Sequence, residues 1–379
     1  MWSRGRPYGS TYAGIRRPMN PAGAADSVNS VDSVGWAIIG CSDIVERRAA
    51  EAILQQPNSR IVAFHSRDLA RAQAFATRFA GRAGTPDAYD DLDLLLTDNR
   101  IQAVYVANEV DRHAGIAIAA ARAGKHVLVE KPMALTVDEC LAMIDAAAQN
   151  GVHLSVAYYA RFFEKAIAMK RVIDEGFLGR VVRATVTQLT HHNPDPSHPK
   201  YWRVTGRGGG NILADVGSHR IDLLVYWLGP PARVAGLADS LSLPYAAPDT
   251  ETALIQLASG AHVTVLASAN LPRSVRPTAG PGNPDGQTSI EIYGTEGALL
   301  TDPWSDTPIQ VTGAAASSTP PISFARSANA HFPMSDDFAT AIAEGRPPRF
   351  SGQDGLWATA VIHGAAESAR TGRFVDIAH

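Results

Sequence analysis

The chain has 379 residues, of which 45% are hydrophobic and 19% are charged, a composition typical of a globular protein rather than a disordered one. Its 34 Lys and Arg residues against 37 Asp and Glu residues give a formal net charge of -3, which excludes the basic excess expected of a nucleic-acid-binding protein. No apolar run reaches the length of a membrane span, and Cys41 and Cys140 lack the spacing of a disulfide framework or a zinc site. We therefore expect a cytoplasmic protein of more than one domain that binds neither nucleic acid, membrane nor metal.

The first 33 residues differ from the rest, since they are rich in Gly, Pro, Ser and Arg and contain no acidic residue before Asp26. We expect residues 1–33 to form a flexible arm. The Arg16-Arg17 pair could belong to a twin-arginine export signal, but the PMNPAGAADS that follows lacks the apolar segment that such a signal requires. A translation start at Met19 is an alternative that stays open.

Short apolar runs alternate with helix-like segments from Val34 onward. The expected strands are 34–40, 60–66, 101–107, 125–130 and 152–158, and the helices between them are 44–56, 68–80, 112–124 and 136–150. These strands are apolar along almost their whole length, which is typical of a parallel sheet covered by helices on both faces. We therefore predict an α/β domain over residues 34–157.

The pattern changes in residues 158–379 to longer runs in which polar and apolar residues alternate. The expected strands here are 180–190, 251–258, 261–269, 287–294 and 297–302, and the helices are 162–176, 213–228, 332–344 and 353–371. Alternation predicts a sheet with one buried and one open face, and Ser259-Gly260 reads as a hairpin turn within it. We expect the last three helices to cover the buried face and the open face to bind another copy of the chain. The two longest loops, 191–211 and 271–286, are expected to carry function.

The turn after the first strand, GCSDIV, holds candidate cofactor-binding residues. Of the G-x-G-x-x-G pattern of dinucleotide-binding folds only Gly40 is present, because Ser42 and Val45 replace the later small residues. The free N–H groups of the following helix N-terminus can still bind a phosphate. We therefore include Gly40, Ser42, Asp43 and Ile44 in the predicted cofactor site.

The second strand ends in FHSRD, where NAD-specific folds place an acidic residue that binds the ribose hydroxyl. Ser66 and Arg67 occupy this position, and a hydroxyl with a guanidinium suits the 2′-phosphate of NADP. We therefore predict NADP as the preferred cofactor and NAD as the second. The alternative, that Arg67 and Asp68 only begin a solvated helix, stays open.

Two further strands of the predicted parallel sheet end in polar residues. One is followed by Asn108 and His113, and the other by Glu130 and Lys131. Ligands of open parallel sheets bind outside the carboxyl ends of the strands, so these residues are expected at the mouth of a dinucleotide cleft. A strand cap followed by a helix lead-in is the alternative for Glu130 and Lys131.

A third cluster begins with three glycines and continues into a helix with Asp215, His219 and Asp222 on one face. A helix that covers a sheet should be apolar on its inner face, and unpaired charges are rarely buried. We therefore expect this polar stripe to face a wet cleft, although a single helical His is more often structural.

Together these motifs resemble the Gfo/Idh/MocA-type oxidoreductases, a family that includes glucose-fructose oxidoreductase and inositol dehydrogenase. The resemblance spans residues 34–377 and is most specific in AGKHVLVEKPMAL, in GGG-x-x-L-x-D-x-G-x-H-x-x-D and in ESARTGRFVDI. It implies a Rossmann domain followed by an α/β domain with a large, mostly antiparallel open sheet, and an NAD(P) cofactor. In this family the lysine, aspartate and histidine that match Lys131, Asp215 and His219 form the catalytic site, and the peptide before the motif's proline is often cis. Arg161 and Trp202-Arg203 are similar to further family positions.

We predict a cytoplasmic NAD(P)-dependent oxidoreductase that transfers a hydride between the nicotinamide and a carbinol carbon of a sugar, sugar acid or cyclitol. We expect His219 to be the general acid/base, with Asp215 favouring its imidazolium form and Lys131 as the second candidate base. The expected substrate pocket comprises Lys131, His192, Trp202, Asp215 and His219. The expected cofactor site comprises Gly40, Ser42, Asp43, Ile44, Ser66, Arg67, Asn108, His113, Glu130, Lys131 and Arg161. A homodimer or homotetramer through the second sheet is expected.

Three alternatives remain. A redox-neutral glycosidase would hold its NAD tightly and oxidise and re-reduce the substrate within one turnover. A non-catalytic dinucleotide sensor would be expected to have lost His219 or Lys131, but both are present. A periplasmic glucose-fructose oxidoreductase would need the export segment that the N-terminal sequence lacks.

Overall fold

The computed structural model describes residues 33–81, 84–191, 195–197, 201–206, 211–269, 286–304, 308–313 and 329–377. All of them belong to Val31–His379, which forms one compact unit. The predicted arm (apart from Ser33), His192, and most of the two long loops lie outside the described residues.

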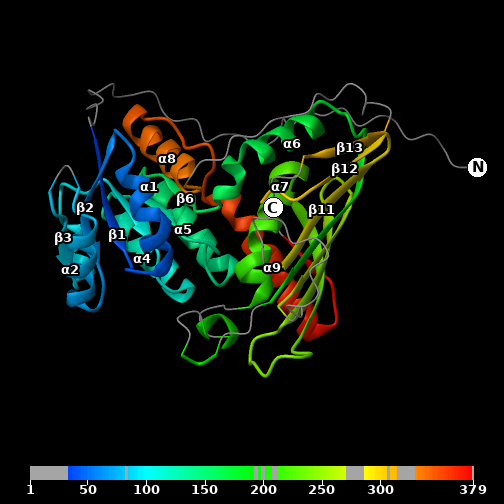
Figure 1. The fold of residues 1–379 in the computed structure, drawn as a ribbon, viewed down its shortest axis with the longest axis horizontal. Coiled ribbons are helices and arrows are strands. Elements are labelled where there is room, and N and C mark those ends of the chain that lie inside the picture. The colour runs from blue at the N-terminus through cyan, green and yellow to red at the C-terminus, as the bar shows by residue number, and fades with distance from the viewer. Residues whose placement is uncertain are drawn as a thin grey trace, which may run out of the picture. The chain divides into compact units, whose positions relative to one another are not determined.

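The first sheet is parallel, as predicted, and its strand order β3-β2-β1-β4-β5-β6 is that of a Rossmann fold (Figure 1). Its strands are β1 (Val34–Ile39), β2 (Ser59–His65), β3 (Asp87–Tyr89), β4 (Ala103–Val106), β5 (His126–Val129) and β6 (Leu154–Val156). Its helical segments are η1 (Val45–Ala49), α1 (Ala50–Leu54), α2 (Leu69–Arg78), α3 (Leu92–Leu96), η2 (Val110–Arg112), α4 (His113–Arg122) and α5 (Val137–Gln149). The predicted strands are confirmed to within two residues at each end.

Burial and capping explain these elements. Every residue of β1 is buried, as expected of a central strand with helices on both faces. Helix α5 begins with a capping box, in which Thr136 accepts from the Glu139 N–H and the Glu139 carboxylate accepts from the Thr136 N–H. The capping box therefore fixes where the loop 130–136, which carries Glu130 and Lys131, ends and the helix begins.

The second sheet has eight strands in the order β13-β12-β11-β7-β10-β9-β8-β14, and β7 with β10 is its parallel pair. Its strands are β7 (Val181–Thr190), β8 (Pro231–Asp239), β9 (Thr250–Leu257), β10 (His262–Ser268), β11 (Gly286–Gly294), β12 (Gly297–Thr301), β13 (Gln310–Gly313) and β14 (Val375–Asp376). The hairpin turn at Ser259-Gly260 is confirmed, with Gly260 at a φ of 86°. The short strands β3, β13 and β14, and the longer β8, were not predicted.

Helices α7 (Ser218–Leu228) and α9 (Gly352–Thr371) pack on each other, on the second sheet's side of the molecule (Figure 1). The helical segments that come before α7 in the chain are η3 (Tyr159–Phe162), α6 (Glu164–Asp174), η4 (Tyr201–Val204) and η6 (Leu213–Gly217). Helix α9 packs on β8 and β9 and also contacts α5 and β6 of the first sheet. Because one helix serves both sheets, the boundary at residues 157/158 stays a prediction.

Helix α8 (Phe332–Glu344) contradicts one expectation. It does not cover the second sheet but packs against α1 and β1 of the first (Figure 1). The Phe338 ring lies 5.8 Å from that of Trp36, and Gln56 donates a hydrogen bond to the Ser335 hydroxyl. The predicted helix 332–344 is confirmed, but an amphipathic pattern does not say which apolar surface a helix covers.

Replacing Phe338 by Ala tests this placement. Phe338 is buried beside Trp36, so the cavity should lower the free energy of unfolding by about 3–5 kcal/mol. Urea denaturation measures the loss, with exposed Leu94→Ala as the control. A loss below about 1 kcal/mol would show that α8 is not part of this core.

Candidate active site

The carboxyl ends of β1 and β4 meet where the strand order of the first sheet reverses. Gly40 has a φ of 103°, and a Cβ there would lie 2.8 Å from the main chain of Ala107. The Ser42 hydroxyl and the Asn108 side-chain oxygen are buried, and neither has a hydrogen-bond partner in the described part of the chain. Two such polar atoms beside a glycine turn fit a ligand that brings its own hydrogen-bonding groups.

The end of β2 carries Ser66 and an exposed Arg67. The Asp68 carboxylate accepts from the Ala70 and Arg71 N–H groups and caps α2, so the helix-start interpretation holds for Asp68. Arg71 was missed from the sequence, although it stands one helical turn after Arg67. Its Nε donates to the Cys41 carbonyl across the glycine turn, at 2.8 Å.

Other predicted cofactor residues have partners within the protein. Asp43 forms an exposed ion pair with Arg47, and Ile44 packs against the core around β1. Both ring nitrogens of His113 lie 3.0 Å from main-chain carbonyls, those of Asn108 and Pro132. His113 therefore ties the loops after β4 and β5 together.

Glu130 is buried directly after β5 and anchors this loop. One carboxylate oxygen accepts from the Tyr105 hydroxyl at 2.6 Å and lies 3.6 Å from His331 Nε2, and the other accepts from the Lys131 N–H. Burial acts to raise the pKa of Glu130, but His331, Tyr105 and Lys131 outweigh it and lower the pKa to about 2. The glutamate is thus a fixed negative charge.

Lys131 meets Asp215 between the two sheets. The Lys131–Pro132 peptide is cis, as the family resemblance implied. The ammonium donates to the Asp215 carbonyl at 2.6 Å and lies 3.2 Å from the Asp215 carboxylate, and both side chains are only about one-sixth exposed. The structure therefore brings together two residues that are 84 positions apart.

Glu251 on β9 anchors the start of the helical segment that bears Asp215. Its buried carboxylate accepts from the Leu213 N–H at 2.8 Å, at the start of η6. Burial raises the pKa of Glu251 to about 7, and the main-chain donors of Leu213 and Ile212 act against this rise. This residue was missed, although an acid at an inward position of an alternating strand is an available signal.

His219 follows Asp215 by one helical turn and is enclosed by the rings of Tyr158, Tyr159 and Trp304, with centroid distances of 5.8, 4.8 and 6.3 Å. Its Nδ1 is buried and has no hydrogen-bond partner among the described residues. Burial, followed by the charges of Lys131 and Arg220, lowers the pKa of His219 well below its usual value. The net shift therefore disfavours the imidazolium, and the expected effect of Asp215 on His219 stays a prediction.

The polar stripe does not face a cleft along its whole length. Asp222 is 1% exposed and binds Arg161, whose Nε lies 3.0 and 2.9 Å from its two oxygens, and Arg161 also binds Asp354. Burial raises the pKa of Asp222 to about 6, against the lowering effect of Arg161. All three guanidinium nitrogens are used, so the expected contact of Arg161 with the cofactor is not supported.

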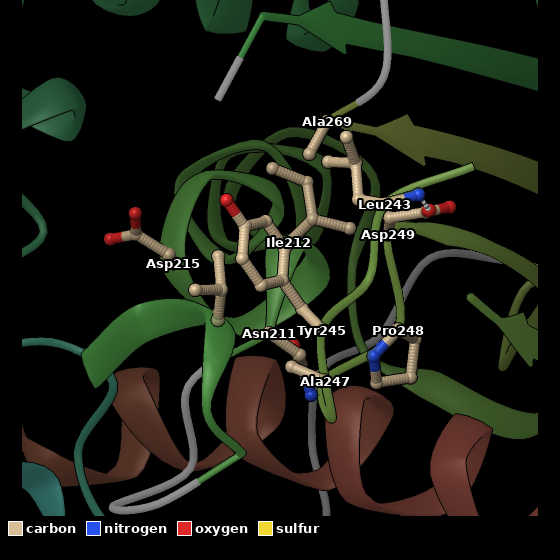
Figure 2. A pocket seen from close by; sticks show the side chains of 10 residues that line it. Asn211, Ile212, Asp215, Leu243, Tyr245, Ala247, Pro248, Asp249 and Ala269 are labelled. Carbon is tan, nitrogen blue, oxygen red and sulfur yellow. Dashed lines mark hydrogen bonds between the residues drawn. The ribbon is translucent and has the colours of Figure 1, made fainter. Parts of the chain in front are cut away.

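A pocket opens beside Asp215 (Figure 2). Its walls comprise Val204, Asn211, Ile212, Asp215, Leu243, Tyr245, Ala247, Pro248, Asp249 and Ala269. Asp249 accepts from the N–H groups of Leu241, Ser242 and Leu243, which fixes the loop that bears Tyr245. Trp202 lies in neighbouring η4, but its side chain, like His192, falls outside the described residues.

The described residues contain neither a metal-binding cluster nor a membrane-spanning helix. No group of three or more His, Cys, Asp or Glu side chains is placed to hold a metal ion there. No helix in the same residues combines the length and apolar character needed to cross a bilayer.

Comparison with known proteins identifies the family. Residues 34–158 match the oxidoreductase family with an NAD-binding Rossmann fold, and residues 166–300 match the GFO/IDH/MocA C-terminal domain. The chain belongs to the GFO/IDH/MocA family. Over 349 residues this GFO/IDH/MocA protein is 28% identical to a 1,5-anhydro-D-fructose reductase of Ensifer adhaerens, which covers 90% of this chain and 98% of the reductase.

Two further relatives agree with this assignment. An uncharacterised oxidoreductase of Rhizobium meliloti is 31% identical over 280 residues, covering 73% of this chain and 77% of its own. The structure of a levoglucosan dehydrogenase in complex with NADH and levoglucosan is 25% identical, with a TM-score of 0.77 over 92% of this chain and 100% of the dehydrogenase. This GFO/IDH/MocA protein is an NAD(P)-binding oxidoreductase, and Gly40 with the unpartnered oxygens of Ser42 and Asn108 fits that cofactor.

The lowered pKa of His219 has a measurable consequence. Because burial and Lys131 disfavour the imidazolium, His219 should stay neutral as the pH falls from 8 to 6. Nitrogen NMR of the imidazole, assigned by the signal lost in His219→Gln, measures this. Lys131→Met should raise the pKa of His219, and an imidazole already charged at pH 7 in the unaltered protein would contradict the account.

Proposed function

We propose that this GFO/IDH/MocA protein interconverts a carbinol and a carbonyl on a small polyhydroxy substrate, a sugar, sugar acid or cyclitol. The observation that most supports this proposal is the contact of the Lys131 ammonium with Asp215. His219 follows Asp215 by one helical turn, and its Nδ1 has no hydrogen-bond partner among the described residues. The names of the relatives, a 1,5-anhydro-D-fructose reductase and a levoglucosan dehydrogenase, support a substrate rich in hydroxyl groups. When bound, NAD(P) supplies the hydride acceptor and donor at its nicotinamide.

The proposed roles follow from charge and position. Lys131 donates a hydrogen bond to the reacting oxygen and stabilises the negative charge that develops on it. His219, neutral because of its lowered pKa, accepts the hydroxyl proton, which must leave when a carbinol becomes a carbonyl. Asp215 holds the Lys131 ammonium in place. Lys131 as the proton acceptor remains the second candidate.

The remaining proposals concern the surroundings of the site. Trp202 and His192 are proposed to line the substrate pocket with Tyr245 and Asn211. We also propose a flexible arm over residues 1–33, a cofactor domain over 34–157 and a substrate domain over 158–379. A cytoplasmic location is proposed on the two free, buried cysteines, Cys41 and Cys140.

Kinetics of two substitutions test the catalytic roles. His219→Asn and Lys131→Met should each lower kcat by about tenfold or more, because each removes a group that acts on the proton or the developing charge. Steady-state rates with saturating cofactor measure this, and the dissociation constant of the cofactor controls for folding. If His219→Asn keeps kcat within a few fold while Lys131→Met abolishes turnover, Lys131 is the base. If neither substitution lowers kcat, the proposed site is wrong.

Cofactor preference is proposed to favour NADP(H). Arg67 is exposed just after β2, where Ser66 stands in place of the acidic residue of NAD-specific folds, so Arg67→Ala should weaken NADP(H) binding by about 1.5–3 kcal/mol and leave NAD(H) nearly unchanged. Fluorescence titration with both cofactors measures the difference, with Arg78→Ala at the last residue of α2 as the control. An equal or higher kcat/KM with NAD(H) in the unaltered enzyme would refute the preference.

A homodimer or homotetramer is proposed through the open face of the second sheet. Leu237 of β8 and Leu266 of β10 both pair with Thr252 of β9, and Leu254 of β9 lies two residues further along on the same face. Leu237 is 68% exposed, Leu266 is 39% exposed and Leu254 is 49% exposed. An apolar row of this kind favours burial against another copy.

Light scattering after gel filtration tests the assembly. Leu254→Asp with Leu266→Asp should reduce the mass to that of one chain, because two carboxylates would be buried in the interface. Leu94→Asp, at an exposed leucine of α3, should leave the mass unchanged. A monomeric mass of the unaltered protein at micromolar concentration would rule the proposal out.

A further inference from the structure

Arg220, the residue after His219 on α7, is a buried cation that binds no carboxylate of the described residues. It is 5% exposed, and in the described part of the chain it takes part in no ion pair. Its terminal nitrogens donate to the Val216 carbonyl at 3.0 Å and to the Thr288 hydroxyl at 3.4 Å. Its Nε is buried and has no hydrogen-bond partner in the part of the chain that the structure describes, and its guanidinium carbon lies 3.9 Å from the centre of the Trp304 ring.

The same protein treats another buried arginine differently. Arg161 is 2% exposed and binds the carboxylates of Asp222 and Asp354. Burying a guanidinium without a compensating anion is strongly unfavourable, and contact with an indole face offsets only part of that cost. Burial lowers the pKa of Arg220 to about 10, so the group is still charged at neutral pH.

The acidic groups nearest to Arg220 are engaged elsewhere. Asp215 and Asp302 are close enough to favour its charge, but neither lies within ion-pair distance. The Asp215 carboxylate contacts Lys131, and the Asp302 carboxylate accepts from the Trp304 N–H at 2.9 Å. Arg220 therefore stands beside the proposed base without an ion-pair partner among the described residues.

A guanidinium has five N–H donors, and two of those of Arg220 are used by Val216 and Thr288. The three that remain include the Nε–H, and a planar carboxylate matches such a fork with two parallel hydrogen bonds. A substrate carboxylate would also supply the ion-pair partner that Arg220 lacks among the described residues.

We propose that Arg220 binds the carboxylate of the substrate, so that this enzyme acts on sugar acids in preference to neutral sugars and cyclitols. The inference rests on the proposed function and selects one of its three substrate classes. It also assigns Arg220 and Trp304 to the substrate side of the site, which no motif of the sequence indicated.

Substrate binding would then influence the proposed base. Arg220 is one of the charges that disfavour protonation of His219. A carboxylate against the guanidinium cancels that field, so a bound sugar acid allows His219 to take up the hydroxyl proton more readily than a bound neutral sugar does.

Matched substrate pairs test the proposal. D-galacturonate with D-galactose, D-glucuronate with D-glucose, and D-gluconate with D-glucitol differ chiefly in the carboxylate, and each is assayed with NAD and NADP. The acid of at least one pair should have a kcat/KM roughly ten- to a hundredfold above its neutral partner, the effect of one charge-assisted hydrogen-bond pair. Neutral sugars used equally well, or sugar phosphates preferred, would overturn the carboxylate assignment and leave the proposed function intact.

Substitutions of Arg220 test whether this residue causes the preference for acidic substrates. Arg220→Gln should reduce the acid-to-neutral ratio of kcat/KM at least about tenfold, mainly through KM, and Arg220→Lys should restore part of it. Arg233→Gln, at an exposed arginine on the open face of the second sheet, should leave the ratio unchanged. A ratio unaffected by Arg220→Gln would overturn the proposal.

Binding gives a readout that needs neither turnover nor a correctly folded variant. Titration calorimetry of the unaltered protein with D-gluconate and with D-glucitol should show tighter binding of the acid, and equal affinity would overturn the proposal. If no sugar, cyclitol or acid is oxidised with either cofactor but D-gluconate still binds more tightly, the proposed function fails and the anion site stands.

Discussion

The contact between Lys131 and Asp215 is the constraint on which the rest of the site depends. Lys131 stands at the end of a strand of the first sheet, and Asp215 at the start of the helical segment that covers the second. Each partner is held by a buried carboxylate of its own side, Glu130 behind Lys131 and Glu251 behind Asp215. An ammonium, largely shielded from water, therefore has a fixed position at the junction of the two sheets.

Fixed charge at this junction also determines what the neighbouring groups can do. Lys131 and Arg220 both disfavour protonation of His219, so the imidazole is a neutral acceptor of hydrogen bonds in the free protein. Arg220, unlike Lys131, forms no ion pair among the described residues. A sugar acid, the substrate class that we propose, would bring both a hydroxyl proton for His219 and a carboxylate for Arg220.

Local patterns were sufficient to predict the two sheets and the residues at their edges. Wholly apolar strands such as β1 indicated the parallel sheet, and alternation in β9 and β10 indicated the open one. Lys131, Asp215 and His219 were found because polar residues stand where strands end or on an otherwise covering helix. Their convergence, however, was an implication of the family resemblance, because a pattern does not say which distant segments meet.

What could not be predicted depends on such distant contacts. Helix α8 has an apolar face, but only the fold shows that it packs on Trp36. Asp222 was taken for a cleft residue because its partner Arg161 lies 61 positions away. For the same reason the sequence did not indicate that Arg220 forms no ion pair among the described residues, since a missing partner is apparent only when the neighbours in the fold are known.

A double-mutant cycle on Lys131 and Asp215 measures how strongly the two side chains depend on each other. If the two side chains act as one unit, Lys131→Met, Asp215→Asn and the double variant should lower kcat by similar factors, with a coupling energy of at least about 1 kcal/mol. Losses that multiply in the double variant, so that the coupling energy is close to zero, would show that the residues act independently and would contradict the account.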